Sequence, residues 1–283
     1  MHPVIYTSNF AYDDPRKEWY HRYADWQSLA IEIFHDRLSP YAALKIIDES
    51  NISQILQDNY LHFSLDGFWS ISALKLASII DFIHSPYTHM YWIDLDTYVT
   101  TLNAEVLYCD QGKITTCIST HNLSDKYLQT NFDCSKITAY EHICKYMGVK
   151  THDVISIPNT WYMSMGKDSA MECEEFIRNI PSIQRDLQAG DLDVSEWGNE
   201  HFLTFIINHI CDATNVDTLG MYSDISFVTT PNVTRESLIL FDILNTKKFV
   251  QLCGLYYKML MPLLYFMEHG LLDDGQIIRN EDA

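Results

Sequence analysis

The spacing of apolar and polar positions in the first 94 residues alternates between a strand-like and a helical period. Short apolar runs of strand type cover residues 4–10, 43–47, 60–65 and 89–94. The segments between them carry apolar residues at helical spacing, over residues 15–38, 52–57 and 67–84. This alternation of strands and helices predicts an α/β fold with a mixed, mostly parallel sheet that helices cover on both faces.

The remaining chain continues with two strands and then becomes helical. Strands are predicted at residues 113–119 and 154–165, with a helix over 136–147 between them. Helical patterns then cover residues 169–188, 196–210 and 247–269. Because no repeat, linker or sharp change of composition interrupts the chain, we expect one domain over residues 1–283 with a helical C-terminal part.

The net charge of the chain limits the classes of partner that it can bind. Its 283 residues are 47% hydrophobic, and its formal net charge is −19. A nucleic-acid partner is disfavoured, because phosphate backbones need a basic surface. An anionic substrate would need local Lys or Arg side chains, backbone amides or a metal ion.

Cysteine usage and hydropathy indicate a cytoplasmic protein. The seven cysteines are scattered, odd in number and without a CxxC motif, which disfavours a disulfide framework and a zinc site. The N-terminal residues lack the basic start and apolar stretch of a secretory signal. The longest apolar region, residues 249–266, is interrupted by polar residues, Gly254 and Pro262, so a packed helix is expected rather than a transmembrane one.

Two carboxylates close the apolar run at residues 89–94. In an extended chain the side chains at positions i and i+2 point to the same side, so Asp94 and Asp96 can converge on one hard cation. Open α/β sheets bind their ligands at such strand ends. The plainer alternative is a pair of turn residues, since Asp is common where strands end.

A phosphohydrolase motif fits the same pair less well. That motif places an aspartate nucleophile at the end of the first strand, in the pattern DxDxT. Here the fourth residue after Asp94 is Tyr98, and the pair lies nearly a hundred residues into the chain.

The stretch from Gly67 through Lys75 to Asp96 resembles the nucleotide-sugar-dependent glycosyltransferases of the GT-A fold. In that superfamily a helix with a basic residue precedes an apolar strand that ends in a DxD motif. Residues 92–96, Trp-Ile-Asp-Leu-Asp, are similar to the W-[IV]-D-x-D strand of galactosyl- and xylosyltransferases, and to glycan-building enzymes of large DNA viruses and bacteria. The resemblance covers roughly the first 170 residues, and the DxD block is its specific part.

The resemblance implies a donor site with a metal ion. Asp94, Leu95 and Asp96 would form it with Mn²⁺ or Mg²⁺, and Asp96 would bind the metal most directly. It also implies that residues 1–120 bind the nucleotide sugar and that residues 121–283 bind the acceptor. His269 is the candidate third metal ligand, or else the cap of a helix.

Further donor contacts follow from the same resemblance. The end of the first strand would cradle the nucleotide base, and Lys75 and Arg16 would face the phosphates. Tyr6 is alternatively a core residue, and Lys75 alternatively lies on a solvated helix face. The residues at the end of the first strand are Tyr6, Thr7, Ser8 and Asn9.

Acceptor and catalytic candidates lie in the second half of the chain. Asn159, Trp161 and Tyr162 would line the acceptor pocket, although Trp161 stands where the family often has glycine. Asn199 and Glu200 begin a helix that would approach the reacting sugar. In an inverting enzyme Glu200 or Asp191 would be the general base. In a retaining enzyme, which the resemblance favours, the donor phosphate takes the acceptor proton.

The expected function is therefore transfer of a hexose or pentose from a nucleoside-diphosphate donor, UDP-linked by preference, to a glycan hydroxyl. Two alternatives stay open at this point. One is a non-catalytic carbohydrate- or nucleotide-binding protein of the same fold, and the other is an Asp-dependent phosphohydrolase.

Overall fold

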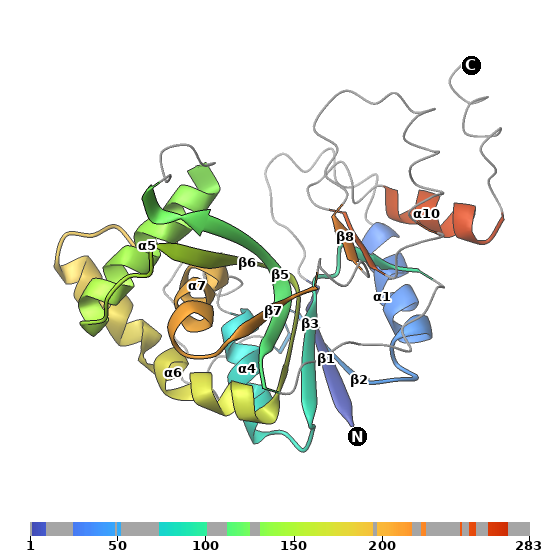
Figure 1. Ribbon diagram of the computed structural model, residues 1–283. Helices are drawn as coiled ribbons and strands as arrows, with labels where there is room; N and C mark the ends of the chain where they lie inside the picture. Colours follow the sequence, from blue (N-terminus) through green and yellow to red (C-terminus); the bar gives the residue numbers. More distant parts are fainter. Residues whose placement is uncertain are drawn as a thin grey trace, which may run out of the picture. The chain divides into compact units, whose positions relative to one another are not determined.

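The computed structural model of the chain is shown in Figure 1. It describes residues 2–9, 25–48, 50–51, 74–100, 112–124, 131–194, 197–216, 222–224, 244, 249–252 and 260–270. The chain divides into two compact units, each treated by itself below. Unit 1 contains Met1–Tyr6, Ile47–Trp92 and Tyr108–Asn215, and unit 2 contains Thr7–Ile46, Ile93–Leu107 and Val216–Ala283.

Strands and helices alternate through most of the described chain. The strands are β1 (Pro3–Ser8), β2 (Ala43–Ile47), β3 (His89–Ile93), β4 (Thr97–Val99), β5 (Ile114–Asn122), β6 (Val154–Gly166), β7 (Ala213–Asn215), β8 (Tyr222–Asp224) and β9 (Phe249–Gln251). The helices are α1 (Asp25–Arg37), α4 (Leu74–His84), α5 (Asn131–Met147), α6 (Lys167–Ala189), α7 (Asn199–His209) and α10 (Leu260–Glu268).

The larger sheet has six strands in the order β2-β1-β3-β6-β5-β7. Strands β1 and β3 are parallel, with Tyr6 beside Trp92, and β5 is parallel to β7 but antiparallel to β6. Helices α6 and α7 pack on β6, and α4 packs on α6 (Figure 1). The predicted α/β fold with a mixed, mostly parallel sheet flanked by helices is confirmed.

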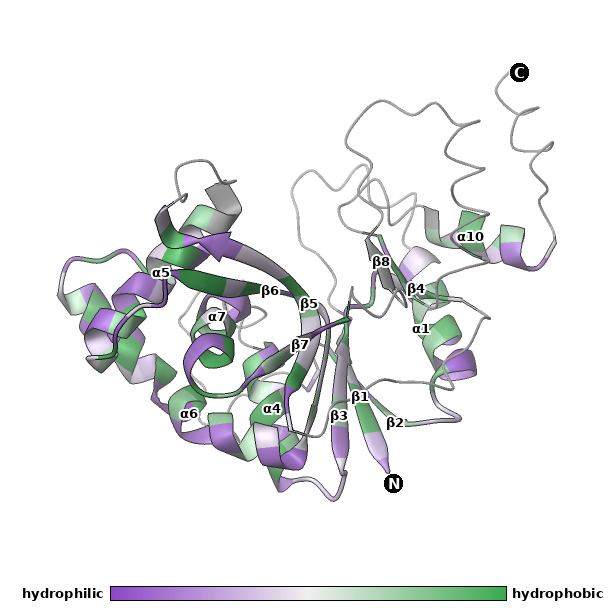
Figure 2. Cartoon of the chain, in the orientation of Figure 1, coloured by the Kyte–Doolittle hydropathy of each residue, from purple (hydrophilic) through white to green (hydrophobic). Residues whose placement is uncertain are grey.

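The centre of unit 1 is apolar on both sides of its strands. All five positions of β3 are buried, and β6 is buried at every position from Thr160 to Gly166. Continuous burial of this kind is typical of strands that are covered on both faces. Figure 2 shows the corresponding hydrophobic stretches along α4 and β6.

A bulge interrupts the pairing of β5 with β6. Cys117 pairs with Asn159, whereas its neighbour Thr116 pairs with Met163. Residues 160–162 of β6 are therefore extra residues between two consecutive pairs. The Thr116 hydroxyl closes the bulge, because it lies 3.0 Å from the carbonyl oxygen of Asn159 and 2.8 Å from that of Tyr162. Bulges re-aim backbone groups and side chains, and here the re-aimed segment begins at Thr160.

Unit 2 contains a three-stranded sheet in the order β4-β9-β8. Strand β4 is antiparallel to β9, β8 is parallel to β9, and α1 packs on both β4 and α10. A buried ion pair joins the two helices, with Arg37 Nη1 at 2.7 Å from Glu268 Oε2. Arg37 also donates to the carbonyl oxygen of Val99, and Tyr98 donates to Glu268.

The predicted helix over residues 247–269 is wrong in its first part. Phe249–Gln251 forms β9, and the helix that follows in the described chain is α10, with Pro262 in its first turn, where proline is tolerated. A short apolar run fits a buried strand and a helix equally well, and pairing with β4 decides between them here. Strands β4, β7 and β8 were not predicted, because three residues are too few to show a period.

Other sequence predictions lie outside the described residues. These are the helix over residues 52–57, the strand over 60–65, residues 67–73 of the helix over 67–84, and the first ten residues of the helix over 15–38, with Arg16 among them. The single domain and its division at residue 120 stay predictions. Of the helices that the structure describes, none combines the length and the apolar character that crossing a bilayer requires.

Candidate functional site

The acidic pair lies in the turn between β3 and β4. The N–H of Thr97 donates to the carbonyl oxygen of Asp94 at 3.0 Å, which closes the turn. The N–H of Leu252 donates to the carbonyl oxygen of Asp96 at 2.8 Å, which ties the turn to the chain that leaves β9. The Leu95 side chain is buried, so this turn has a fixed backbone within unit 2.

The oxygen atoms of this turn suit a hard divalent cation. Asp94 is half-buried, Oδ1 of Asp96 is buried, and the buried hydroxyl of Thr97 makes no hydrogen bond with any described residue. Carboxylate and hydroxyl oxygens are the ligand class that Mg²⁺ and Mn²⁺ prefer. Among the described residues no three His, Cys, Asp or Glu side chains are grouped to hold a metal ion.

His269 lies directly after α10. Its Nδ1–H donates to the carbonyl oxygen of Tyr265 at 2.8 Å, and its ring lies 4.1 Å from the Tyr265 ring, centroid to centroid. These contacts are those of a residue that closes a helix end. The metal role of His269 stays a prediction.

The end of β1 holds the residues predicted to cradle a nucleotide base. Because β1 and β3 are parallel neighbours, the residues after Tyr6 and those after Trp92 leave their strands at the same edge. Tyr6 itself is 1% exposed, and its hydroxyl donates to Asp81 on α4. Burial, with the hydrogen bond to Asp81, raises the pKa of Tyr6 far above its ordinary value. The donor role of Tyr6 stays a prediction, as do those of the three residues that follow it, Thr7, Ser8 and Asn9.

Lys75 on α4 reaches the bulge of β6. Its Nζ donates to the carbonyl oxygen of Thr160 at 2.8 Å and to the hydroxyl of Thr160 at 2.9 Å. The same ammonium lies 5.5 Å from the centre of the Trp92 ring, a distance that permits a cation–π contact. Lys75 is half-buried, so its helix face is not a solvated one.

Glu200 completes the contacts of the bulge. Its Oε1 accepts from the N–H of Thr160 at 2.9 Å and from the hydroxyl of Thr160 at 3.2 Å. Its Oε2 lies 2.5 Å from Nζ of Lys136, which is 2% exposed on α5. We call Lys75, Lys136, Thr160 and Glu200 the bulge network. In it Lys75 of α4 and Glu200 of α7 meet at Thr160 of β6, and Lys136 of α5 contacts Glu200.

The charge of Glu200 is stabilised by two lysines. Burial alone would raise the pKa of this carboxyl group, but the charges of Lys136 and then Lys75 outweigh it and lower the pKa below its ordinary value. A carboxylate with a lowered pKa is a weak proton acceptor near neutral pH. The network therefore suits a positioning or electrostatic role better than general base catalysis.

The first turn of α7 is held by two further side chains. Oδ1 of Asn199 accepts from the N–H of Leu76 at 3.4 Å, in the first described turn of α4. Nδ1 of His201 accepts from the N–H of Gly198 at 3.0 Å, so the His201 proton sits on Nε2, 3.2 Å from the Ser135 hydroxyl. Asn199 thus aligns α4 with α7 in this structure, and its catalytic role stays a prediction.

His201 predicts a pH dependence of stability. Burial, followed by the charge of Lys136, lowers the pKa of His201 to about 4. The unfolded chain binds this proton below pH 6.5, so the free energy of unfolding should fall between pH 6.5 and pH 4, by about 3 kcal/mol for this group. Urea unfolding of His201→Asn should show a correspondingly flatter profile, whereas His35→Asn, at an exposed position on α1, should follow the wild type. Equal slopes for wild type and His201→Asn would contradict this assignment.

The predicted acceptor residues lie at the same bulge. Trp161 and Tyr162 are 1% and 0% exposed, and their rings contact each other at 6.1 Å between centroids. Asn159 is exposed, and its backbone is tied to Thr116. A sugar therefore has access to Asn159 in this structure, while the two aromatic rings lie in the core. Their acceptor role stays a prediction.

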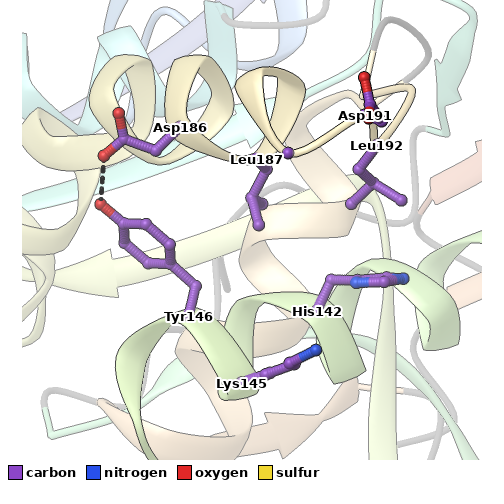
Figure 3. Close-up of a pocket in the computed structure, with 8 residues that line it drawn as sticks. His142, Lys145, Tyr146, Asp186, Leu187, Asp191 and Leu192 are labelled. Carbon is purple, nitrogen blue, oxygen red and sulfur yellow. Dashed lines mark hydrogen bonds between the residues drawn. The ribbon is translucent and has the colours of Figure 1, made fainter.

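Asp191 lies apart from the contacts of Glu200, in the turn that follows α6. Its φ is 64°, and its N–H donates to the carbonyl oxygen of Gln188. It lines an open pocket formed by the C-terminal ends of α5 and α6, shown in Figure 3. The pocket residues are His142, Lys145, Tyr146, Asp186, Leu187, Gly190, Asp191 and Leu192. The role of Asp191 as a base stays a prediction.

Lys136 and Thr160 were missed by sequence reasoning. Lys136 falls at helical spacing with the buried residues Tyr140 and Ile143, so a lysine on a core-facing helix stripe was a readable signal of a buried counter-ion. Thr160 gave no such signal, because its importance comes from the register shift that turns its backbone toward side chains.

Comparison with known proteins finds similarity among solved structures. No protein-family model and no curated protein matches the sequence. A glycosyltransferase involved in the glycosylation of the major capsid of PBCV-1 is 11% identical, with a TM-score of 0.43 over 93% of this chain and 100% of that one. The galactosyltransferase LgtC, in complex with donor and acceptor sugar analogues, is 11% identical, with a TM-score of 0.45 over 89% and 87%.

Mouse xyloside xylosyltransferase 1, in its apo form, is 12% identical, with a TM-score of 0.41 over 88% of this chain and 96% of that one. At this level of similarity the comparisons carry no argument about the function of this chain. They assign no activity to any of its residues.

Proposed function

We propose that the chain is a metal-dependent glycosyltransferase that moves a sugar from a UDP-linked donor to a hydroxyl of a glycan, with retention of configuration. The observation that carries this proposal is the acidic turn after β3. Asp94 and Asp96 flank a buried leucine there, and backbone hydrogen bonds hold the turn on both sides.

Asp94 and Asp96 would hold Mn²⁺ or Mg²⁺ through their carboxylates. When bound, such an ion neutralises negative charge on a diphosphate leaving group. The chain carries a net charge of −19, so a diphosphate needs this local compensation to bind beside two aspartates.

The bulge network disfavours Glu200 as the base of an inverting reaction. An inverting transferase needs a base whose pKa is near the working pH, and Lys136 and Lys75 keep the Glu200 pKa low. In the retaining reaction the departing phosphate of the donor accepts the proton of the acceptor hydroxyl. Glu200 then keeps Thr160 and Lys75 in place without gaining or losing a proton.

The proposal is tested by removing one carboxylate. Asp96→Ala should lower Mn²⁺-dependent UDP binding and transfer from UDP-sugars by at least about 100-fold, because a hard cation with one protein carboxylate is held weakly. Binding is measured by isothermal titration with UDP, with and without Mn²⁺. Asp36→Ala, at an exposed position on α1 of the same unit, is the matched control and should behave as wild type.

Each result bears on a different function. Unchanged UDP binding in Asp96→Ala would refute the metal role. Mn²⁺-dependent binding without transfer or slow donor hydrolysis would indicate a non-catalytic binding protein. Cleavage of phosphate monoesters without any effect on sugar nucleotides would indicate a phosphohydrolase.

A further inference from the structure

The pocket at the ends of α5 and α6 offers a second place for a ligand. Its volume is about 360 Å³, and it opens to solvent. Tyr146 on its rim is 41% exposed, while Leu187 and Leu192 are half-buried at its wall. Figure 3 shows Leu192 pointing toward the His142 ring and the Asp191 carboxylate pointing the other way; Asp191 is exposed. The pocket thus combines one accessible aromatic ring with apolar and polar walls.

The aromatic ring is held in place before any ligand binds. The Tyr146 hydroxyl donates to Oδ2 of Asp186 at 2.8 Å, so the ring is tethered across the pocket from α5 to α6. The turn behind it is also ordered, because the N–H groups of Gly190 and Leu192 donate to carbonyl oxygens at the end of α6. A preformed site of this kind loses little conformational entropy on binding.

The charges of the pocket select a neutral ligand. Asp186 and Asp191 line it, and two helices point their C-terminal ends, which carry partial negative charge, toward it. These features disfavour an anion. Lys145 and His142 on the facing helix disfavour a strong cation, and within the described chain no three His, Cys, Asp or Glu side chains are grouped around a metal.

We propose that this pocket binds a neutral saccharide, as a glycan-binding subsite separate from the donor chemistry of Asp94 and Asp96. Sugar hydroxyls both donate and accept, which matches the Asp186 carboxylate acceptor and the Lys145 donor. The apolar face of a pyranose ring matches the exposed side of Tyr146 and the leucines beside it. Such a subsite would retain an extended glycan on unit 1.

The experiment uses the full chain without nucleotide or metal. Lactose, maltose, cellobiose and xylobiose are titrated singly, and binding is followed by saturation-transfer difference NMR. At least one should bind saturably, with a Kd on the order of millimolar, as expected for a small open site. Tyr146→Ala and Asp186→Ala should each weaken that binding about tenfold. Tyr146→Phe keeps the ring without its tether and should fall between them and the wild type.

Tyr41→Ala is the matched control, because Tyr41 is 43% exposed but belongs to unit 2. It should leave saccharide binding unchanged. The inference is overturned if none of the four saccharides binds saturably, or if Tyr146→Ala and Asp186→Ala bind as wild type. If the wild-type chain shows no Mn²⁺-dependent UDP binding in a parallel titration, that result would instead count against the transferase proposal. It would not affect the proposal that this pocket binds a saccharide.

Discussion

Replacement of Lys136 by methionine is expected to lower the free energy of unfolding by about 3 to 5 kcal/mol, the usual cost of removing one partner from a buried ion pair. Lys136 is 2% exposed, and its Nζ lies 2.5 Å from Oε2 of Glu200. Methionine keeps most of the apolar stem, so the loss reports the charge rather than a cavity. The Glu200 carboxylate would remain buried with Lys75 as its remaining lysine partner.

The change should also alter the pH range over which Glu200 is ionised. Without Lys136 the pKa of Glu200 should rise, because burial then works against a single lysine instead of two. Any step that needs Glu200 ionised should then show a pH profile displaced upward. Urea denaturation at pH 7, together with the pH dependence of UDP-sugar turnover, measures both effects.

Two further variants separate charge from packing. Lys145→Met removes an exposed lysine from the same helix and should change stability by less than about 0.5 kcal/mol. Lys136→Met combined with Glu200→Gln removes both charges and should recover part of the loss. If the double variant is as unstable as the sum of the single ones, the pair is not coupled and this account of the network is wrong.

Replacement of Glu268 by alanine should have a similar effect on unit 2. The side chains of Arg37 and Glu268 are 8% and 7% exposed, and their closest atoms are 2.7 Å apart. Removal of the carboxylate leaves the Arg37 guanidinium buried against the Tyr98 ring, at 5.3 Å from its centre, so we expect a loss of about 3 to 5 kcal/mol.

This variant should also weaken the proposed metal site, although Glu268 is not one of its ligands. Glu268 accepts from Tyr98, and Arg37 donates to the carbonyl oxygen of Val99, so both hold β4 directly after the Asp94–Asp96 turn. Loosening β4 should lower Mn²⁺-dependent UDP binding several-fold without removing a carboxylate from the turn.

Thermal unfolding and UDP titration of Glu268→Ala measure the two effects side by side. Glu32→Ala, at an exposed position on α1, is the control and should change neither. Glu268→Gln keeps a hydrogen-bond acceptor for Tyr98 and should lose less stability than the alanine variant. Stability of Glu268→Ala equal to that of the control would show that the ion pair contributes nothing to unit 2.

The sequence predicted local elements where one period dominated. Residues 43–47 were predicted as a strand and form β2, and the apolar run before Asp94 forms the fully buried β3. The prediction failed at Phe249–Gln251, which pairs with β4 as a strand and does not form the start of a helix. Short segments follow the partner that tertiary structure supplies, because their own propensity is worth too little to resist it.

Several residues of the candidate site could be chosen from the sequence, but some of their contacts could not. Lys75 and Glu200 could be selected only through the resemblance to GT-A glycosyltransferases, and Asp94 and Asp96 could be selected from the sequence itself, because a carboxylate pair after an apolar strand is a local pattern. The link of Lys75 and Glu200 through Thr160 could not, because it depends on a register shift between β5 and β6. Such a shift is set by the fit of two strands that lie some forty residues apart in the chain.

The sequence by itself therefore determined the α/β alternation, the negative charge and the position of the acidic turn after β3. Only the tertiary structure decided that Lys136 neutralises Glu200, that Arg37 and Glu268 hold β4, and that Asp191 lines a separate pocket. The physical reason is that periodicity records which face of an element is buried. The pairing of buried charges depends on which elements meet, and that is a property of the folded chain.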